Sequence, residues 1–180
     1  MPCYQGEKTN SKSLEGTRIA TFGMKANLDD IKARTTDVLG YYEALSGKDR
    51  DILEEMYEEY VLKEDILDEL KEATSNLCVV VFSAAWCKDC KNAMPVMRHL
   101  QERIGLDVRI FGTIKTAPLD PNVKWAVPPS PPETNEWGVT AIPYFFFFNK
   151  DDGEKVTVLI EKPTIKETLE EEILYVLKHK

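Results

Sequence analysis

Hydrophobic residues follow two different spacings on either side of about residue 76. Before it, apolar residues recur at helical spacing over residues 28–45 and again over residues 49–73, which predicts two helices with Gly47 as a stop signal between them. Residues 1–25 fit neither a period of 2 nor one of 3.6 and are rich in Ser, Thr, Gly and Asn, which predicts a flexible tail. We therefore expect a helical N-terminal extension over residues 26–75.

Residues 76–180 show strand and helix patterns in turn. Residues 77–82 and 144–148 are continuous apolar runs, typical of strands that are buried on both faces. A helical stripe lies between residues 88 and 104 and is followed by a strand pattern over residues 107–114, which together predict a parallel βαβ unit. The fold class expected is α/β, with a mixed four-stranded sheet flanked by helices.

The C-terminal part of this region predicts a hairpin and a last helix. Turn residues at 149–153 join the second apolar run to a strand over residues 154–161. The last helix is expected to begin at the capping-box spacing Thr164 to Glu167 and to bury Ile165. Six of the ten prolines lie in residues 115–132, which excludes regular helix or central strand there and predicts a stiff connecting loop.

Composition narrows the possible partners. The chain has 180 residues, with 23 Lys plus Arg against 31 Asp plus Glu and a net charge of −8. That charge opposes binding to nucleic acid or to an anionic membrane surface, and no apolar run reaches the ~20 residues of a membrane span. Four cysteines are too few for a disulfide-stapled secreted domain, and the N-terminus has no apolar stretch typical of a signal peptide. We expect a cytoplasmic protein.

The most informative short pattern is Trp86-Cys87-Lys88-Asp89-Cys90, a C-x-x-C motif between a buried strand and a helix. Unpaired backbone N–H groups at a helix N-terminus favour an anion, so we expect the thiolate of the first cysteine to be stabilised. The second sulfur lies within about one helical turn, close enough to form a disulfide. Cys87 is therefore the expected attacking thiolate and Cys90 the resolving thiol.

The alternative for this motif is half of a zinc site, which needs two more ligands. The remaining candidates are poorly placed, because Cys78 lies in a buried strand, Cys3 in the tail, His99 two turns along the same helix and His179 at the chain end. We therefore expect no metal site and no organic cofactor.

The region from about residue 76 to 180 resembles the thioredoxin family. The segment 82–91 is similar to the family's active-site strand and loop, and Pro95 matches the proline that kinks its active-site helix. The segment 137–143 resembles the one that leads into the family's cis-proline, here Pro143. The resemblance implies that Ile142 and Pro143 face the cysteine pair and that the backbone of Ile142 pairs with an extended substrate.

The position of Trp86 in the sequence indicates its role. Next to Cys87 it is expected to shield the sulfur and to offer an apolar contact surface for substrate.

The chain also departs from the family's pattern. Many members carry a buried aspartate six residues before the first cysteine, where this chain has Val81, so that local base is missing. Lys88 and Asp89 stand between the cysteines, where the lysine stabilises a nearby thiolate and the aspartate opposes it. We expect these two residues to modulate the redox pair without predicting the net sign.

These patterns predict a thiol–disulfide oxidoreductase that reduces protein disulfides through Cys87 and Cys90. Its expected partners are disulfide-containing proteins and an external reductase or low-molecular-weight thiol. The alternative is a redox-sensing or protein-interaction module that uses the same cysteine pair as a switch.

Overall fold

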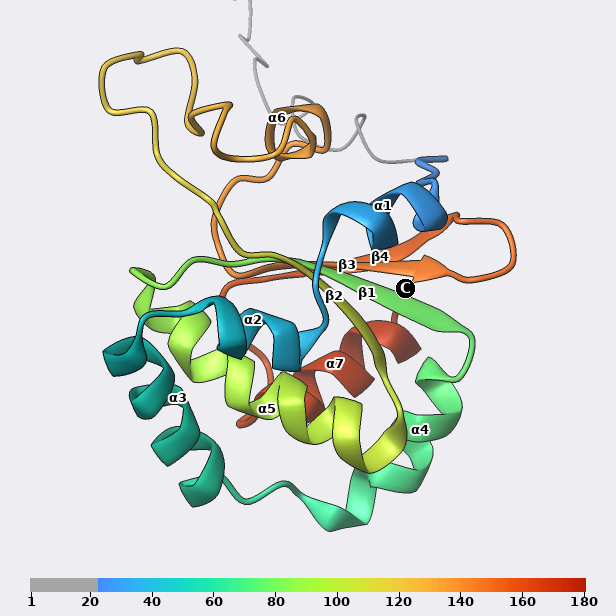
Figure 1. The fold of residues 1–180 in the computed structure, drawn as a ribbon. Coiled ribbons are helices and arrows are strands. Elements are labelled where there is room, and N and C mark those ends of the chain that lie inside the picture. Colours follow the sequence, from blue (N-terminus) through green and yellow to red (C-terminus); the bar gives the residue numbers. More distant parts are fainter. Residues whose placement is uncertain (1–22) are drawn as a thin grey trace, which may run out of the picture.

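The computed structural model describes residues 23–180, so the predicted tail lies almost wholly outside the described residues. Its centre is a four-stranded sheet in the order β2-β1-β3-β4 (Figure 1). The strands are β1 (Leu77–Phe82), β2 (Asp107–Phe111), β3 (Tyr144–Asn149) and β4 (Lys155–Ile160). β1 pairs with β2 in parallel and with β3 antiparallel, and β3 pairs with β4 antiparallel. The predicted mixed sheet is confirmed.

Both faces of the sheet are covered, which explains the continuous apolar runs. Figure 1 shows α2 (Val38–Ala44), α4 (Leu67–Thr74), α5 (Lys88–Ile104) and α7 (Leu169–Lys178) below the sheet, and α1 (Leu28–Arg34) and α6 (Glu133–Glu136) above it. Because side chains alternate along a strand, Phe145 and Phe147 enter the core on one face, and Phe146 and Phe148 enter the core on the other. All four phenylalanines are fully buried.

The first predicted helix, residues 28–45, is broken in two. Thr36, between α1 and α2, donates its backbone N–H to Ile110 at 3.4 Å and accepts one from Ile110 at 2.7 Å, which adds a short bridge to the edge of β2. Asp37 then caps α2 by accepting from the Gly40 backbone at 2.8 Å. A backbone bonded to the sheet at Thr36 cannot continue the helix.

The second predicted helix is also interrupted. α3 runs from Gly47 to Glu59, so Gly47 begins a helix capped by Ser46 and does not end one. An extended stretch follows α3, and the chain then turns through η1 (Glu64–Ile66) into α4. Within that stretch the Lys63 backbone N–H donates to the buried carboxylate of Glu170 at 3.2 Å, which ties it to α7.

The last helix begins one turn later than the sequence predicts. Its capping box is Thr168 with Glu171, and Ile165 is 59% exposed where the sequence predicted burial. The reason is Glu172, whose buried carboxylate accepts backbone N–H groups from residues 164–166 and holds them in a loop. Across residues 23–180, no helix is long and apolar enough to cross a membrane.

Candidate dithiol site

Cys87 and Cys90 lie where β1 gives way to α5. Cys87 is the N-cap residue of α5, and its Sγ accepts the backbone N–H of Cys90 at 3.2 Å. That contact places one of the otherwise free N–H groups of the helix end on the sulfur. Cys87 retains 8% exposure, whereas Cys90 is completely buried. The first cysteine is thus the more accessible of the two.

The loop before β3 faces this pair. The Ile142–Pro143 peptide bond is cis, and the thiol of Cys87 donates to the Ile142 carbonyl oxygen at 3.4 Å. The Pro143 carbonyl accepts the backbone N–H of Glu161 at 2.7 Å, which links this loop to the end of β4. The structure therefore brings together three of the residues singled out from the sequence: Cys87, Ile142 and Pro143.

Trp86 presents an exposed surface beside the cysteine. The side chain is 59% exposed, and its Nε1–H donates to the Ile114 carbonyl at 2.9 Å. A ring anchored by one polar edge and otherwise open to solvent can contact an apolar partner.

The two residues between the cysteines differ in burial. Lys88 is exposed, while Asp89 is half-buried and lines a groove of about 200 Å³ between α5 and the segment 161–169. In the part of the chain that the structure describes, neither Lys88 nor Asp89 forms a side-chain hydrogen bond with the sulfur of Cys87 or Cys90.

Burial dominates the electrostatics of the second cysteine. Desolvation raises the pKa of the Cys90 thiol well above its usual value, and the hydrogen bond with Cys87 raises it further. The Ala84 backbone and the Ser83 side chain act in the opposite direction. Cys90 is therefore held as a protonated thiol at neutral pH.

The third described cysteine, Cys78, lies in β1 away from this pair. Burial raises its pKa to about 11. Within residues 23–180, no group of three His, Cys, Asp or Glu side chains is placed to hold a metal ion.

Two contacts from the N-terminal extension reach the site. The buried hydroxyl of Tyr41 on α2 lies 3.1 Å from that of Ser83, the residue after β1. Asp49 on α3 pairs with Lys91 of α5 at 2.8 Å. Sequence reasoning missed both, because a tyrosine at helical spacing indicates core and an aspartate on an acidic helix face indicates solvent contact.

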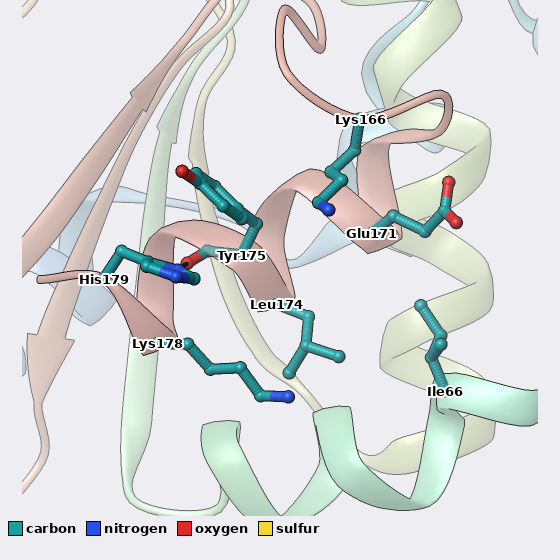
Figure 2. Close-up of a pocket in the computed structure, with 7 residues that line it drawn as sticks. All are labelled: Ile66, Lys166, Glu171, Leu174, Tyr175, Lys178 and His179. Atoms are coloured by element: carbon teal, nitrogen blue, oxygen red, sulfur yellow. Dashed lines mark hydrogen bonds between the residues drawn. The ribbon is translucent and has the colours of Figure 1, made fainter.

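A second cavity is lined by residues that are far from Cys87 and Cys90 in the sequence. It has a volume of about 270 Å³ and is lined by residues of α7 together with Ile66 and Lys166 (Figure 2). Two of its charged residues have ion-pair partners, since Lys178 pairs with Glu69 and Glu171 pairs with Lys63, and the Lys166 ammonium lies 5.1 Å from the centroid of the Tyr175 ring. His179 stacks on Tyr175 with ring centroids 4.2 Å apart. This cavity is a packing gap between α7 and η1.

Taken together, the sheet order, the dithiol at a helix N-terminus and the facing proline loop define a protein of thioredoxin-like fold with a candidate dithiol centre. The thioredoxin family model matches residues 36–173, and the chain belongs to the thioredoxin family, whose chemistry is thiol–disulfide exchange. The match includes α2, α3 and α4 of the N-terminal extension.

Curated relatives agree with this assignment. Thioredoxins of Listeria monocytogenes and Listeria innocua are each 32% identical to this chain over 104 residues, covering 57% of this chain and 85% of the relative.

Two solved structures share the fold at low sequence identity. A Pseudomonas aeruginosa protein of unknown function superimposes with a TM-score of 0.60, and an HIV epitope-scaffold with 0.62. Each is 13% identical and covers 85% of this chain and 96% of its own.

Proposed function

We propose that this protein is a thiol–disulfide oxidoreductase that reduces disulfides in other proteins through Cys87 and Cys90. The observation that carries the proposal is the asymmetry of the pair. Cys87 accepts a helix-end N–H and retains access to solvent, while Cys90 is fully buried three residues further on. An attacking sulfur needs access and thiolate character, and a resolving sulfur needs only proximity to the first.

The reaction proceeds in two exchanges. Cys87 thiolate attacks one sulfur of the substrate disulfide, forming a mixed disulfide and releasing the other substrate sulfur as a thiolate. Cys90 then loses its proton and attacks the Sγ of Cys87, which forms the Cys87–Cys90 disulfide and releases the second substrate thiolate. The two released thiolates take up protons from solvent. Two electrons pass from the protein to the substrate.

The surface around Cys87 supports a peptide-like substrate. Trp86 offers an exposed ring on one side, and the Ile142 backbone lies at the sulfur on the other. An extended substrate chain pairs with this backbone and places its disulfide over Cys87. An external reductase or a low-molecular-weight thiol restores the dithiol, and the cytoplasm is the compartment we propose from the cysteine content.

The test is catalysed reduction of insulin disulfides with dithiothreitol as the electron source. The wild type is expected to accelerate reduction above dithiothreitol alone, and Cys87→Ser to abolish the acceleration. Cys90→Ser is expected to accumulate a mixed disulfide with the substrate. Cys78→Ala is the matched control, because it removes a buried thiol outside the pair.

Two results would count against the proposal. Wild-type protein that forms the Cys87–Cys90 disulfide but does not accelerate insulin reduction would favour a redox switch. Equal activity in Cys87→Ser would exclude Cys87 as the attacking residue.

A further inference from the structure

The resolving step poses a problem that the cysteine pair alone does not solve. Cys90 is completely buried, and burial raises the pKa of its thiol. To attack Cys87 it must nevertheless become a thiolate, and an anion in an apolar interior is costly unless hydrogen-bond donors face it. Val81, fully buried in β1, has no polar side-chain atom to contribute.

Two groups lower the pKa of Cys90, the Ala84 backbone and the Ser83 side chain, and Ser83 contacts a second buried hydroxyl. Ser83 has no exposed surface, and a hydrogen bond from its side chain lowers the pKa of Cys90. The Tyr41 hydroxyl lies 3.1 Å from Ser83 Oγ, with Tyr41 only 4% exposed. The two hydroxyls therefore form a buried pair between α2 and the end of β1, and the Ser83 member of the pair acts on Cys90.

The tyrosine ring is held in place by close packing. It lies against Gly112, where an added Cβ would come within 2.8 Å of two ring carbons. Only a residue without a side chain allows the ring to occupy this position. Tyr41 also lines a cavity of about 220 Å³ between α2 and the end of β2, with Thr36 and Ala44.

We propose that Tyr41 and Ser83 form a hydrogen-bonded hydroxyl pair that stabilises the Cys90 thiolate during the resolving step. This inference rests on the proposed function. Ser83 donates its hydroxyl proton to Cys90 Sγ, and Tyr41 donates to Ser83 Oγ and so fixes the direction in which the serine points. Ser83 contacts a reacting atom, while Tyr41 is a positioning residue that acts through it.

Other titratable groups lie near the Tyr41–Ser83 pair and Cys90. Cys87 faces Cys90 from the same helix end, and Asp49 from α3 raises the pKa of Tyr41. Asp49 is paired with Lys91 at 2.8 Å. Burial is the main reason that the pKa of Tyr41 rises, to about 12, so the phenol keeps its proton and remains a donor throughout the neutral range.

The test separates the two exchanges with Ellman's reagent, which releases one coloured thiolate when Cys87 attacks and a second when Cys90 resolves the mixed disulfide. The rates of both phases are measured against pH in a Cys3→Ser, Cys78→Ala background. The variants are Tyr41→Phe and Ser83→Ala. Tyr42→Phe is the matched control, because the Tyr42 hydroxyl is also buried on α2 but makes no hydrogen bond within the described residues.

The expected result is a slower second phase with an unchanged first phase. Losing a hydrogen bond to a charged group in Tyr41→Phe or Ser83→Ala is expected to slow resolution about tenfold at neutral pH and to move its pH midpoint upward. Ser83→Thr, which retains a hydroxyl, is expected to restore most of the rate. Tyr42→Phe is expected to match the background protein in both phases.

Failure of the proposed function and failure of this inference give different results. If the background protein releases only one thiolate, the pair does not form a disulfide and the proposed function itself fails, and this inference with it. If it releases two but Tyr41→Phe and Ser83→Ala leave the rate and pH midpoint of the second phase unchanged, the hydroxyl pair has no role. Circular dichroism and urea unfolding of each variant identify any loss of fold, and Ser83→Ala decides the question if Tyr41→Phe is unfolded.

Discussion

The Sγ of Cys87 lies 3.4 Å from the carbonyl oxygen of Ile142, a residue 55 positions away in the sequence. This contact joins the start of α5 to the loop before β3 and makes one site from two segments. Under the proposed function, this contact brings a substrate chain that pairs with the Ile142 backbone to the sulfur of Cys87.

The three described cysteines are expected to differ sharply in reactivity. In a Cys3→Ser background, iodoacetamide at neutral pH is expected to modify Cys87 and to leave Cys78 and Cys90 largely unmodified, because burial raises the pKa of both. Peptide mass spectrometry after brief labelling measures the modified fraction at each site. Labelling that favours Cys90 would contradict the assignment of roles.

Trp86 is expected to affect substrate binding more than chemistry. Trp86→Ala removes an exposed ring beside Cys87 and leaves the sulfur's helix-end N–H in place. We expect KM for a protein disulfide to rise several-fold, as for an aromatic contact worth about 1 kcal/mol, with kcat changed little. Steady-state kinetics measures both parameters, and an unchanged KM would remove Trp86 from the binding surface.

The ion pair between Arg34 and Glu133 is expected to stabilise the protein. It joins α1 to α6, and the Glu133 side chain is only 8% exposed, so removing the arginine leaves a buried carboxylate without its cation. Because Arg34 itself is 38% exposed, we expect Arg34→Met to lower the free energy of unfolding by about 1–3 kcal/mol, below the range for a fully buried pair.

Arg103 supplies the control for that substitution. Its pair with Glu64 is exposed on both sides, and Arg103→Met is expected to change stability by less than about 0.5 kcal/mol. Urea unfolding compares the two variants. Equal effects would show that burial of Glu133 does not matter.

Alkaline pH is expected to destabilise the fold through its buried tyrosines. Burial raises the pKa of Tyr41 to about 12 and also raises the pKa of Tyr42 and Tyr60, whereas an exposed tyrosine titrates near about 10. Since the folded state retains these protons longer, their stabilising contribution is complete below about pH 10 and is lost as pH rises toward the folded-state values.

Urea unfolding between about pH 9 and 12 tests this dependence. Tyr42→Phe is expected to decline less steeply than the wild type, because it lacks one of the groups that take part. Parallel curves for the two proteins would contradict the pKa assignment.

Sequence reasoning was most successful where one local pattern determines the structure. β1 and β3 are continuous apolar runs because both sheet faces are covered, and the position of the C-x-x-C motif between a strand and a helix pattern correctly placed Cys87 at a helix N-terminus. The break at Thr36 could not be predicted in this way, because it depends on backbone pairing with Ile110, 74 residues away.

The remaining site residues were missed for the same reason. Tyr41 and Ser83 meet across 42 positions, and although Ser83 lies in the segment 82–91, no motif links it to Tyr41. The late start of α7 likewise depends on Glu172, whose carboxylate holds the preceding loop. Long-range polar contacts of this kind leave no periodic signal in the sequence.

The redox potential of the Cys87–Cys90 pair tests the central claim most directly. The protein is equilibrated in glutathione and dithiothreitol buffers, and Trp86 fluorescence and thiol labelling then give the redox potential of the pair. Cys90→Ser is the control. A reductase is expected to have a potential below about −260 mV, the lower end of cytosolic glutathione values obtained by extraction. A potential well above that range, or no Cys87–Cys90 disulfide at any ratio, would contradict the account.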